Sequence, residues 1–326
     1  MSGRGAGLAS RLRGANNEGV LVVVLLALIV GMTVASPKFF TLGTLFSLVF
    51  NSMVPLVFAL AVLLVIISGG IDVSFAAVAI FAAYTTVKMS TAGHFDAGLI
   101  GSFVIALAIG ALLGLLNGAV IARFRLPTLI ATLGTQSIFR GILLTWIGSQ
   151  YIANLPAGMA HVSGAALVST HQGFLHVLVI PVILLALLVA WMLRSTLLGR
   201  SIYAIGGDLE AARRVGFRVV RTQLLLYVIV GRSANPQTLV GTELDTIASV
   251  VLGGASIFGG RGSVIGTVLG VLLIQLIDNS LLLIGVPSAW QRAAIGALLL
   301  IGVGVQSVTA MRAKRSAVLI TEEVAS

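Results

Sequence analysis

Long apolar runs constrain this chain more than any other feature of its sequence. Several approach or exceed the roughly 20 residues that an α-helix needs to cross the hydrocarbon core of a bilayer. Of the 326 residues, 58% are hydrophobic and only 9% are charged. A soluble domain needs more charge to cover its surface, so this composition excludes one. The sequence therefore predicts an all-α, polytopic helical membrane protein.

We expect about ten transmembrane segments, with both termini in the cytoplasm. One transmembrane domain would occupy 19–309, between a cytoplasmic N-terminal tail at 1–18 and a cytoplasmic C-terminal tail at 310–326. The expected segments lie at about 19–36, 45–67, 75–89, 99–122, 126–147, 175–193, 222–231, 247–252, 264–284 and 293–309. Arginines in short loops and tails fix this orientation, because basic residues favour the cytoplasmic side.

Charge and cysteine content exclude several other classes. A net charge of +10 would suggest a nucleic-acid partner in a soluble protein. Here the arginines lie mainly in short loops and termini, so we expect a lipid bilayer and no nucleic acid. The chain contains no cysteine, which excludes disulfides and thiolate metal sites. We expect no metal and no cofactor.

The most hydrophilic internal segment lies within 194–221, which holds six arginines against two acids. This is the strongest cytoplasmic signal in the chain. Its second half predicts a short amphipathic helix that Asp208 caps and Gly216 ends. A charged helix between membrane segments can dock a soluble partner. An ordinary basic cytoplasmic loop is the alternative interpretation.

The string Glu210-Ala211-Ala212, followed after three residues by Gly216, resembles the coupling-loop motif of ABC importer membrane subunits. The wider string GRSIYAIGGDLEAARRVG is similar to the ribose/xylose/autoinducer-2 branch of sugar permeases. Three further strings agree with that branch: SGGIDVS at 68–74, LPTLIATLGT at 126–135 and GGASIFGGRGS at 253–263. The resemblance covers nearly the whole chain.

The resemblance implies the permease subunit of a bacterial ABC importer in the inner membrane, translocating a sugar or sugar-like solute. The implied partners are separate ATP-binding subunits, a periplasmic solute-binding protein and a second permease chain, identical or paralogous. The residues implied to couple the permease to the ATPase are Asp208, Glu210, Ala211, Ala212, Arg213 and Gly216. We expect no catalytic residue, because the glycine pairs lack the Gly-Lys-Ser/Thr ending of a phosphate-binding loop.

Polar residues inside apolar segments are candidates for the solute path, because they are costly when they face lipid. The candidates are Asn51, Asp72, Gln136, Asp278 and Asn279. Asp72 has a second interpretation as a cap of the following helix. An ion- or proton-coupled secondary transporter is the alternative function, and Asp72 and Asp278 are the carboxylates that it could use.

Two more polar residues are interpreted as structural. Arg140 is a cation about midway along its segment, and we expect it to reach an interface or to pair with Asp72 or Asp278. Asn117 lies beside Gly110, Gly114 and Gly118, whose four-residue spacing predicts a packing seam. We expect Asn117 to join helices rather than to bind solute.

The segment 222–231 departs from the resemblance. Ten helical residues rise about 15 Å, half of the hydrocarbon thickness. Related permeases carry a full span here, and roughly a dozen residues are missing from this chain. Without this segment the basic residues near Arg312 would lie outside, against the charge rule. We interpret the gap as an internal deletion that impairs folding or transport.

Overall fold

The fold is known from a computed structural model, which describes residues 18–36, 39–92, 98–124, 126–147, 164–231, 242–283, 285, 287, 290–297 and 300. The helices are α2 (Glu18–Ala35), α3 (Leu42–Ile67), α4 (Phe75–Ala92), α5 (Gly98–Phe124), α6 (Thr128–Ile147), α8 (Val179–Ser195), α9 (Leu197–Gly207), α10 (Leu209–Arg214), α11 (Val219–Gly231), α12 (Thr242–Leu252) and α13 (Val264–Leu283). The described part is therefore mostly helical, as predicted.

The expectation of an all-α chain is wrong in one place. Strands β1 (Ala166–Thr170) and β2 (Gly173–His176) form an antiparallel hairpin between the segments expected at 126–147 and 175–193, and β2 includes the first two residues of the second segment. Ser169 pairs with Phe174 and Thr170 with Gly173, so His171 and Gln172 make a two-residue turn. Alternating β-branched and aromatic residues beside a short polar turn favour such a hairpin.

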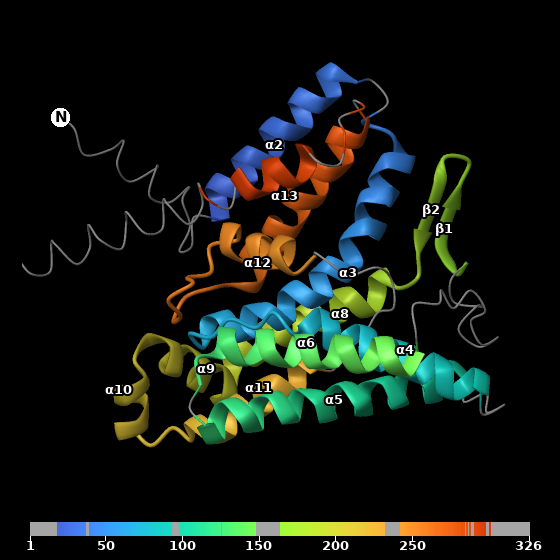
Figure 1. The fold of residues 1–326 in the computed structure, drawn as a ribbon. Helices are drawn as coiled ribbons and strands as arrows, with labels where there is room; N and C mark the ends of the chain where they lie inside the picture. Colours follow the sequence, from blue (N-terminus) through green and yellow to red (C-terminus); the bar gives the residue numbers. More distant parts are fainter. Residues whose placement is uncertain are drawn as a thin grey trace, which may run out of the picture.

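Helix α3 is the centre of the fold (Figure 1). Every residue from Phe58 to Ile67 is buried, because α8, α9, α11 and α12 surround this half of the helix. Helices α2, α12 and α13 form one group beside α3, whereas α4, α5, α6 and α11 form a second group. The two groups meet along α3.

Within the described ranges, four helices are apolar and long enough to cross a membrane: α2, α3, α5 and α13. A fifth crossing results if α8 and α9, which bend by 71° at their junction, are taken as one broken span. About ten spans remain a prediction. The tails 1–17 and 310–326, and most of the expected last span at 293–309, lie outside the described residues.

The glycine seam on α5 packs against α11. A methyl group on Gly118 would lie 3.2 Å from Cβ of Tyr227 and 3.3 Å from Cα of Leu224, so α11 would have to give way by a few tenths of an ångström. Gly110 and Gly114 are buried on the same helix. Helix α11 itself has 13 residues, which rise about 20 Å. It is longer than the apolar run expected there, and residues 232–241, which follow it, lie outside the described residues.

Helices α3 and α12 end in the same way. At the end of α3, the amide of Gly69 donates to Ile66 and that of Gly70 to Val65. At the end of α12, Gly254 donates to Val251 and Ala255 to Val250. Gly69 has φ 83° and Gly254 has φ 91°, the left-handed conformation that this ending requires. Helices α3 and α12 therefore end in the same backbone turn.

Candidate coupling helix and solute path

The predicted amphipathic helix and its cap are confirmed. Asp208 has extended backbone angles, and its Oδ1 accepts from the amides of Glu210 and Ala211, each at 2.9 Å. These bonds satisfy amide groups that the first turn of a helix leaves unpaired. Gly216 follows α10 with φ 93°, which ends the helix and returns the chain to the bundle.

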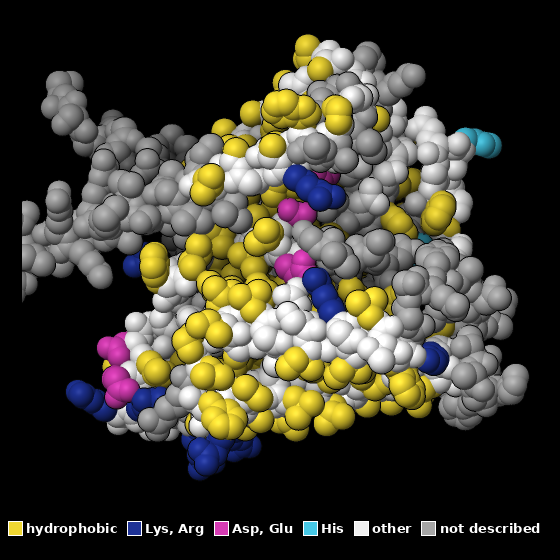
Figure 2. All heavy atoms as spheres, in the orientation of Figure 1, with side chains coloured by type: hydrophobic (Ala, Val, Ile, Leu, Met, Phe, Trp, Pro, Cys, Tyr) yellow, Lys and Arg dark blue, Asp and Glu magenta, His cyan; other side chains and the backbone are white. Residues whose placement is uncertain are grey.

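One side of α10 is anchored and the other is open. Ala212 is buried against Ile205 and Val219, the last turn of α9 and the first of α11. Glu210 and Arg213 are exposed and form an ion pair of 2.6 Å. Figure 2 shows charged side chains gathered at the α10 end of the molecule, whereas apolar side chains cover much of the remaining face. Helix α10 is therefore held to the bundle on one side and exposes a charged surface on the other.

Replacing Asp208 by alanine is expected to fray α10, because the amides of Glu210 and Ala211 lose their acceptor. The cost of such a cap is about 1 kcal/mol, or about a fivefold larger open population. Tryptic cleavage after Arg213 in inside-out vesicles should accelerate by that factor. Asp208→Asn is the control, since it keeps the acceptor oxygen and should cleave at the original rate. Equal rates for the two variants would contradict the capping role.

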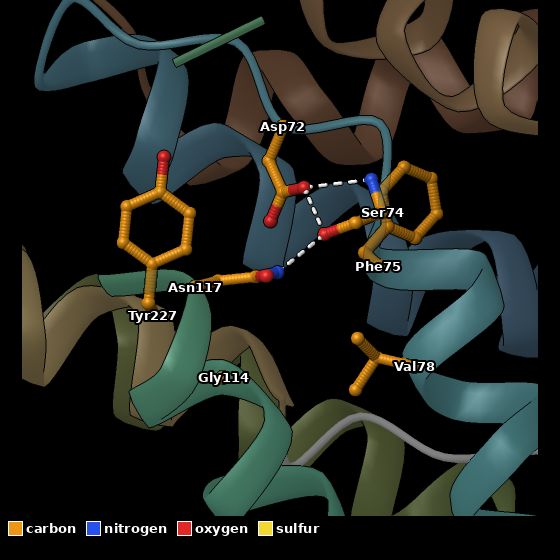
Figure 3. A pocket seen from close by; sticks show the side chains of 7 residues that line it. All are labelled: Asp72, Ser74, Phe75, Val78, Gly114, Asn117 and Tyr227. Atoms are coloured by element: carbon orange, nitrogen blue, oxygen red, sulfur yellow. Dashed lines mark hydrogen bonds between the residues drawn. The ribbon is translucent and has the colours of Figure 1, made fainter. Parts of the chain in front are cut away.

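Asp72 is a capping residue in this structure (Figure 3). It is 1% exposed, and its Oδ1 accepts from the amide and the hydroxyl of Ser74, both at 2.7 Å. Asn117 donates to the same hydroxyl at 2.7 Å. This joins α5 to the start of α4, so the prediction that Asn117 joins helices is confirmed. The gap around these groups has no room for a water molecule. The structure therefore supports the cap interpretation of Asp72.

The extended segment before α4 is held by hydroxyls of α6. The amide of Ile71 donates to Oγ1 of Thr128 at 3.0 Å, and the amide of Val73 donates to Oγ1 of Thr132 at 3.3 Å. These threonines belong to the LPTLIATLGT string. Their hydroxyls take the place of the helix partners that an extended segment lacks.

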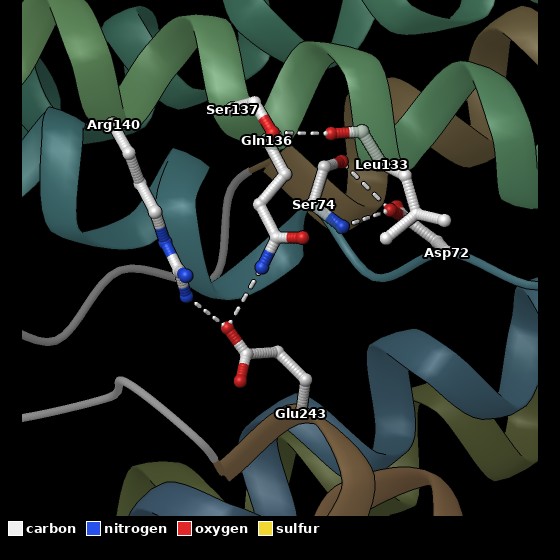
Figure 4. A network of polar contacts seen from close by, with 7 residues as sticks. All are labelled: Asp72, Ser74, Leu133, Gln136, Ser137, Arg140 and Glu243. Carbon is white, nitrogen blue, oxygen red and sulfur yellow. Dashed lines mark hydrogen bonds and ion pairs between the residues drawn. The ribbon is translucent and has the colours of Figure 1, made fainter.

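Arg140 pairs with Glu243, not with Asp72 or Asp278 as expected (Figure 4). Gln136, one turn earlier on α6, donates to the same carboxylate oxygen at 2.9 Å. Glu243 is 9% exposed at its side chain and lies in the first turn of α12. The bridge joins the two helix groups, since α6 packs on α4 and α5.

Glu243 was not among the predicted path residues. The sequence did contain an indication. Glu243 is an acid at the start of an apolar run, and ionisable residues in membrane segments usually pair with a residue of opposite charge, as was expected for Arg140. The sequence could not choose among the acids, because that choice depends on how α6 lies beside α12.

Asn51 and Asn279 lie together on α3 and α13. Nδ2 of Asn51 donates to Oδ1 of Asn279 at 3.4 Å, and Nδ2 of Asn279 donates to the carbonyl of Gln275 at 2.9 Å. Asp278 precedes Asn279 on α13 and is partly buried. Of the predicted path residues, Asn51 and Asn279 are thus hydrogen-bonded to each other, and Gln136 is hydrogen-bonded to Glu243. Asp72 has its own separate network.

These features define a class: a helical membrane protein that carries polar pairs between its helices and a capped, charged helix at one end. Residues 44–303 match the family described as "Branched-chain amino acid transport system / permease component". The chain therefore belongs to this permease family and is a membrane-embedded transport component.

Curated relatives agree with the family. The autoinducer 2 import system permease protein LsrC of Yersinia pseudotuberculosis serotype O:3 (strain YPIII) is 34% identical over 304 residues, covering 88% of this chain and 84% of the relative. LsrC of Enterobacter sp. (strain 638) is 34% identical over 296 residues, covering 86% and 83%. No solved structure matches the chain.

Proposed function

We propose that this chain is the transmembrane permease subunit of a bacterial ABC importer for a sugar or sugar-like solute, autoinducer 2 being the first candidate. The observation that carries the proposal is α10, a helix capped at both ends, anchored by Ala212 and exposed at Glu210 and Arg213. Such a surface fits a soluble ATP-binding subunit. The importer names of the relatives support the same function.

The proposed assembly follows from this role. Two permease chains, identical or paralogous, would span the inner membrane about ten times each and share ATP-binding subunits on the cytoplasmic side. A periplasmic solute-binding protein would deliver solute from the other side. The permease would not hydrolyse ATP itself, because its sequence has no phosphate-binding loop.

The proposed solute path lies where the polar bridges join the helix groups. Carboxylate, amide and guanidinium groups offer the donors and acceptors that the hydroxyls of a sugar require. Gln136, Arg140 and Glu243 provide all three at the junction of α6 and α12. Asn51 and Asn279 add a second amide pair between α3 and α13. We place Asp278 beside that pair on the path and Asp72 outside it.

An ion-coupled secondary transporter fits the structure less well. It needs a carboxylate that can change its proton or ion state during transport. Of the two candidate carboxylates, Asp72 is enclosed and hydrogen-bonded to Ser74, with no room for water beside it, so such a mechanism would have to rely on Asp278 alone. A secondary transporter also has no use for an exposed coupling helix.

We further propose that the chain carries an internal deletion near residue 231. The alignment with the Yersinia relative runs over 304 positions but covers 88% of 326 residues, or about 287, so the relative has about 17 residues in total that this chain lacks. We place much of that loss directly after Gly231, where the apolar run gives way to polar residues. Residues 232–241, where the joint would lie, are outside the described residues.

Co-purification tests the proposed function. The chain, expressed with its candidate ATP-binding subunit, is expected to retain that subunit when purified from membranes. Glu210→Arg should abolish the complex, because it reverses an exposed charge on α10 and breaks the pair with Arg213. Glu210→Asp is the matched control, since it keeps the negative charge at the same position of α10 and should retain the subunit. Retention of the subunit by Glu210→Arg would refute docking on this helix.

A further inference from the structure

Three backbone segments meet directly behind the coupling helix. They are the end of α9, the end of α3 and the loop between α12 and α13. We call the four glycines at the contact, Gly69, Gly206, Gly259 and Gly260, the glycine junction. Gly206 lies two residues before Asp208, the cap of α10.

Gly206 is the centre of the junction. A methyl group on it would lie 1.8 Å from the carbonyl oxygen of Ile67 and 2.7 Å from the amide nitrogen of Gly260. Both neighbours are backbone atoms, so neither can move aside as a flexible side chain would. The amide of Gly260 also donates to the carbonyl of Ile67 at 2.8 Å. The loop after α12 is thereby bonded to the end of α3 at the surface that Gly206 touches.

The other glycines complete the contact. A methyl group on Gly259 would lie 2.5 Å from the carbonyl oxygen of Gly206 and 2.8 Å from Cα of Gly69. Gly259 and Gly260 have φ of 87° and 72°, a conformation that other residues rarely adopt. Tyr203, one turn before Gly206 on α9, donates from its hydroxyl to the carbonyl of Gly262 at 2.8 Å. The end of α9 is thus fixed to both segments.

The glycine junction lies between α10 and two non-helical segments of the bundle, which we call the two breaks. On one side is α10. On the other side are the segment 68–74, which leads into α4, and the segment 253–263, which leads into α13. Because the contact is between backbone atoms, no flexible side chain can absorb a displacement of α9, and the neighbouring segments must move with it.

We propose that Gly206 is a positioning residue for coupling: it transmits movement of α10 to both breaks through the glycine junction. This inference rests on the proposed docking of an ATP-binding subunit at α10. Movement at one site then reaches the starts of α4 and α13 together. Close packing at Gly206 is what the transmission requires, and a side chain there would separate the three segments.

Gly207 provides a matched control. It is adjacent on the same helix, yet a methyl group on it would meet nothing within 4 Å. Gly206→Ala and Gly207→Ala therefore differ in the junction contact and little else. The reporter is Phe258→Cys, because Phe258 is 71% exposed in the loop after α12 and the chain has no other cysteine. The rate of maleimide labelling of this cysteine reports movement of the segment 253–263 between α12 and α13.

The experiment measures labelling in the complex with the ATP-binding subunit, without nucleotide and with a non-hydrolysable ATP analogue. In the parent and in Gly207→Ala, the analogue should change the labelling rate by about tenfold, a usual size for coupling between sites. In Gly206→Ala the subunit should still co-purify, while the nucleotide-dependent change is lost. An unchanged nucleotide response in Gly206→Ala would overturn the inference.

Tyr203→Phe keeps the test decisive if Gly206→Ala fails to assemble. It removes only the hydroxyl bond to Gly262 and should reduce the nucleotide response while the subunit remains bound. A full response in Tyr203→Phe, together with no assembly of Gly206→Ala, would assign the junction a purely structural role and overturn the inference. Absence of subunit from the parent chain is a different result, which refutes the proposed function itself.

Discussion

Glu243→Leu is expected to destabilise the protein more than any other single change in its polar bridges. Leucine would leave Arg140 without its carboxylate between two helices, and a guanidinium cannot be neutralised by losing its proton. Removing one partner of such a pair costs about 3 kcal/mol, toward the lower end of the usual range because Arg140 is 35% exposed. Thermal unfolding of the detergent-purified chain, followed by size-exclusion chromatography, measures the loss.

The reverse variant separates charge from packing. Arg140→Leu should cost less than Glu243→Leu, because the carboxylate keeps the bond from Gln136. The double variant with both leucines should be more stable than Glu243→Leu alone, since no charge then remains unpaired. Ser137→Leu, on an exposed position of α6, is the control for adding an apolar side chain. A stability of Glu243→Leu equal to that of the parent would contradict the bridge.

Lengthening α11 is expected to increase uptake more than any other change. Insertion of about 12 apolar residues after Gly231 adds about 18 Å of helix and brings α11 to spanning length. Membrane yield should rise several-fold, because small gains in stability raise abundance strongly in cells. Uptake of labelled autoinducer 2 or ribose, in cells that lack their own permease for it, is the functional measurement.

The control for the insertion is a Gly-Ser segment of the same length. It lengthens the connection to α12 equally but cannot cross a bilayer. Gain from the apolar insertion alone would support the deletion. Equal results from both insertions, or no gain in yield and uptake from either, would show that the chain is complete with a short α11.

Local features of the fold could be predicted from the sequence because they depend on near neighbours. Asp208 and Gly216 mark a helix between them by their own chemistry, and the structure places the cap and the end there. The glycine seam on α5 likewise follows from its spacing. The β-hairpin at 166–176 was missed because its two strands are short and lie directly before a longer apolar run.

Contacts between distant segments could not be predicted in the same way. The rule that a cation inside the membrane needs a partner was right for Arg140, but it could not select Glu243 among several acids. Asp72 shows the opposite difficulty, since a cap and a path residue have the same sequence pattern. The glycine junction was equally hidden: its glycine pairs were visible as breaks, but nothing in the chain indicated that they meet at Gly206.

The separation of a buried face and an exposed face on α10 has a consequence for cells that contain several importers. The face that holds the helix depends on Ala212, which is buried against Ile205 and Val219. The outer face depends on Leu209, Glu210 and Arg213, which touch little of their own chain. Under the docking proposed above, partner choice and folding would depend on separate residues of one short helix. Duplicated transporters can diverge on the outer face, and thereby avoid cross-talk between their ATP-binding subunits, without repacking the membrane domain.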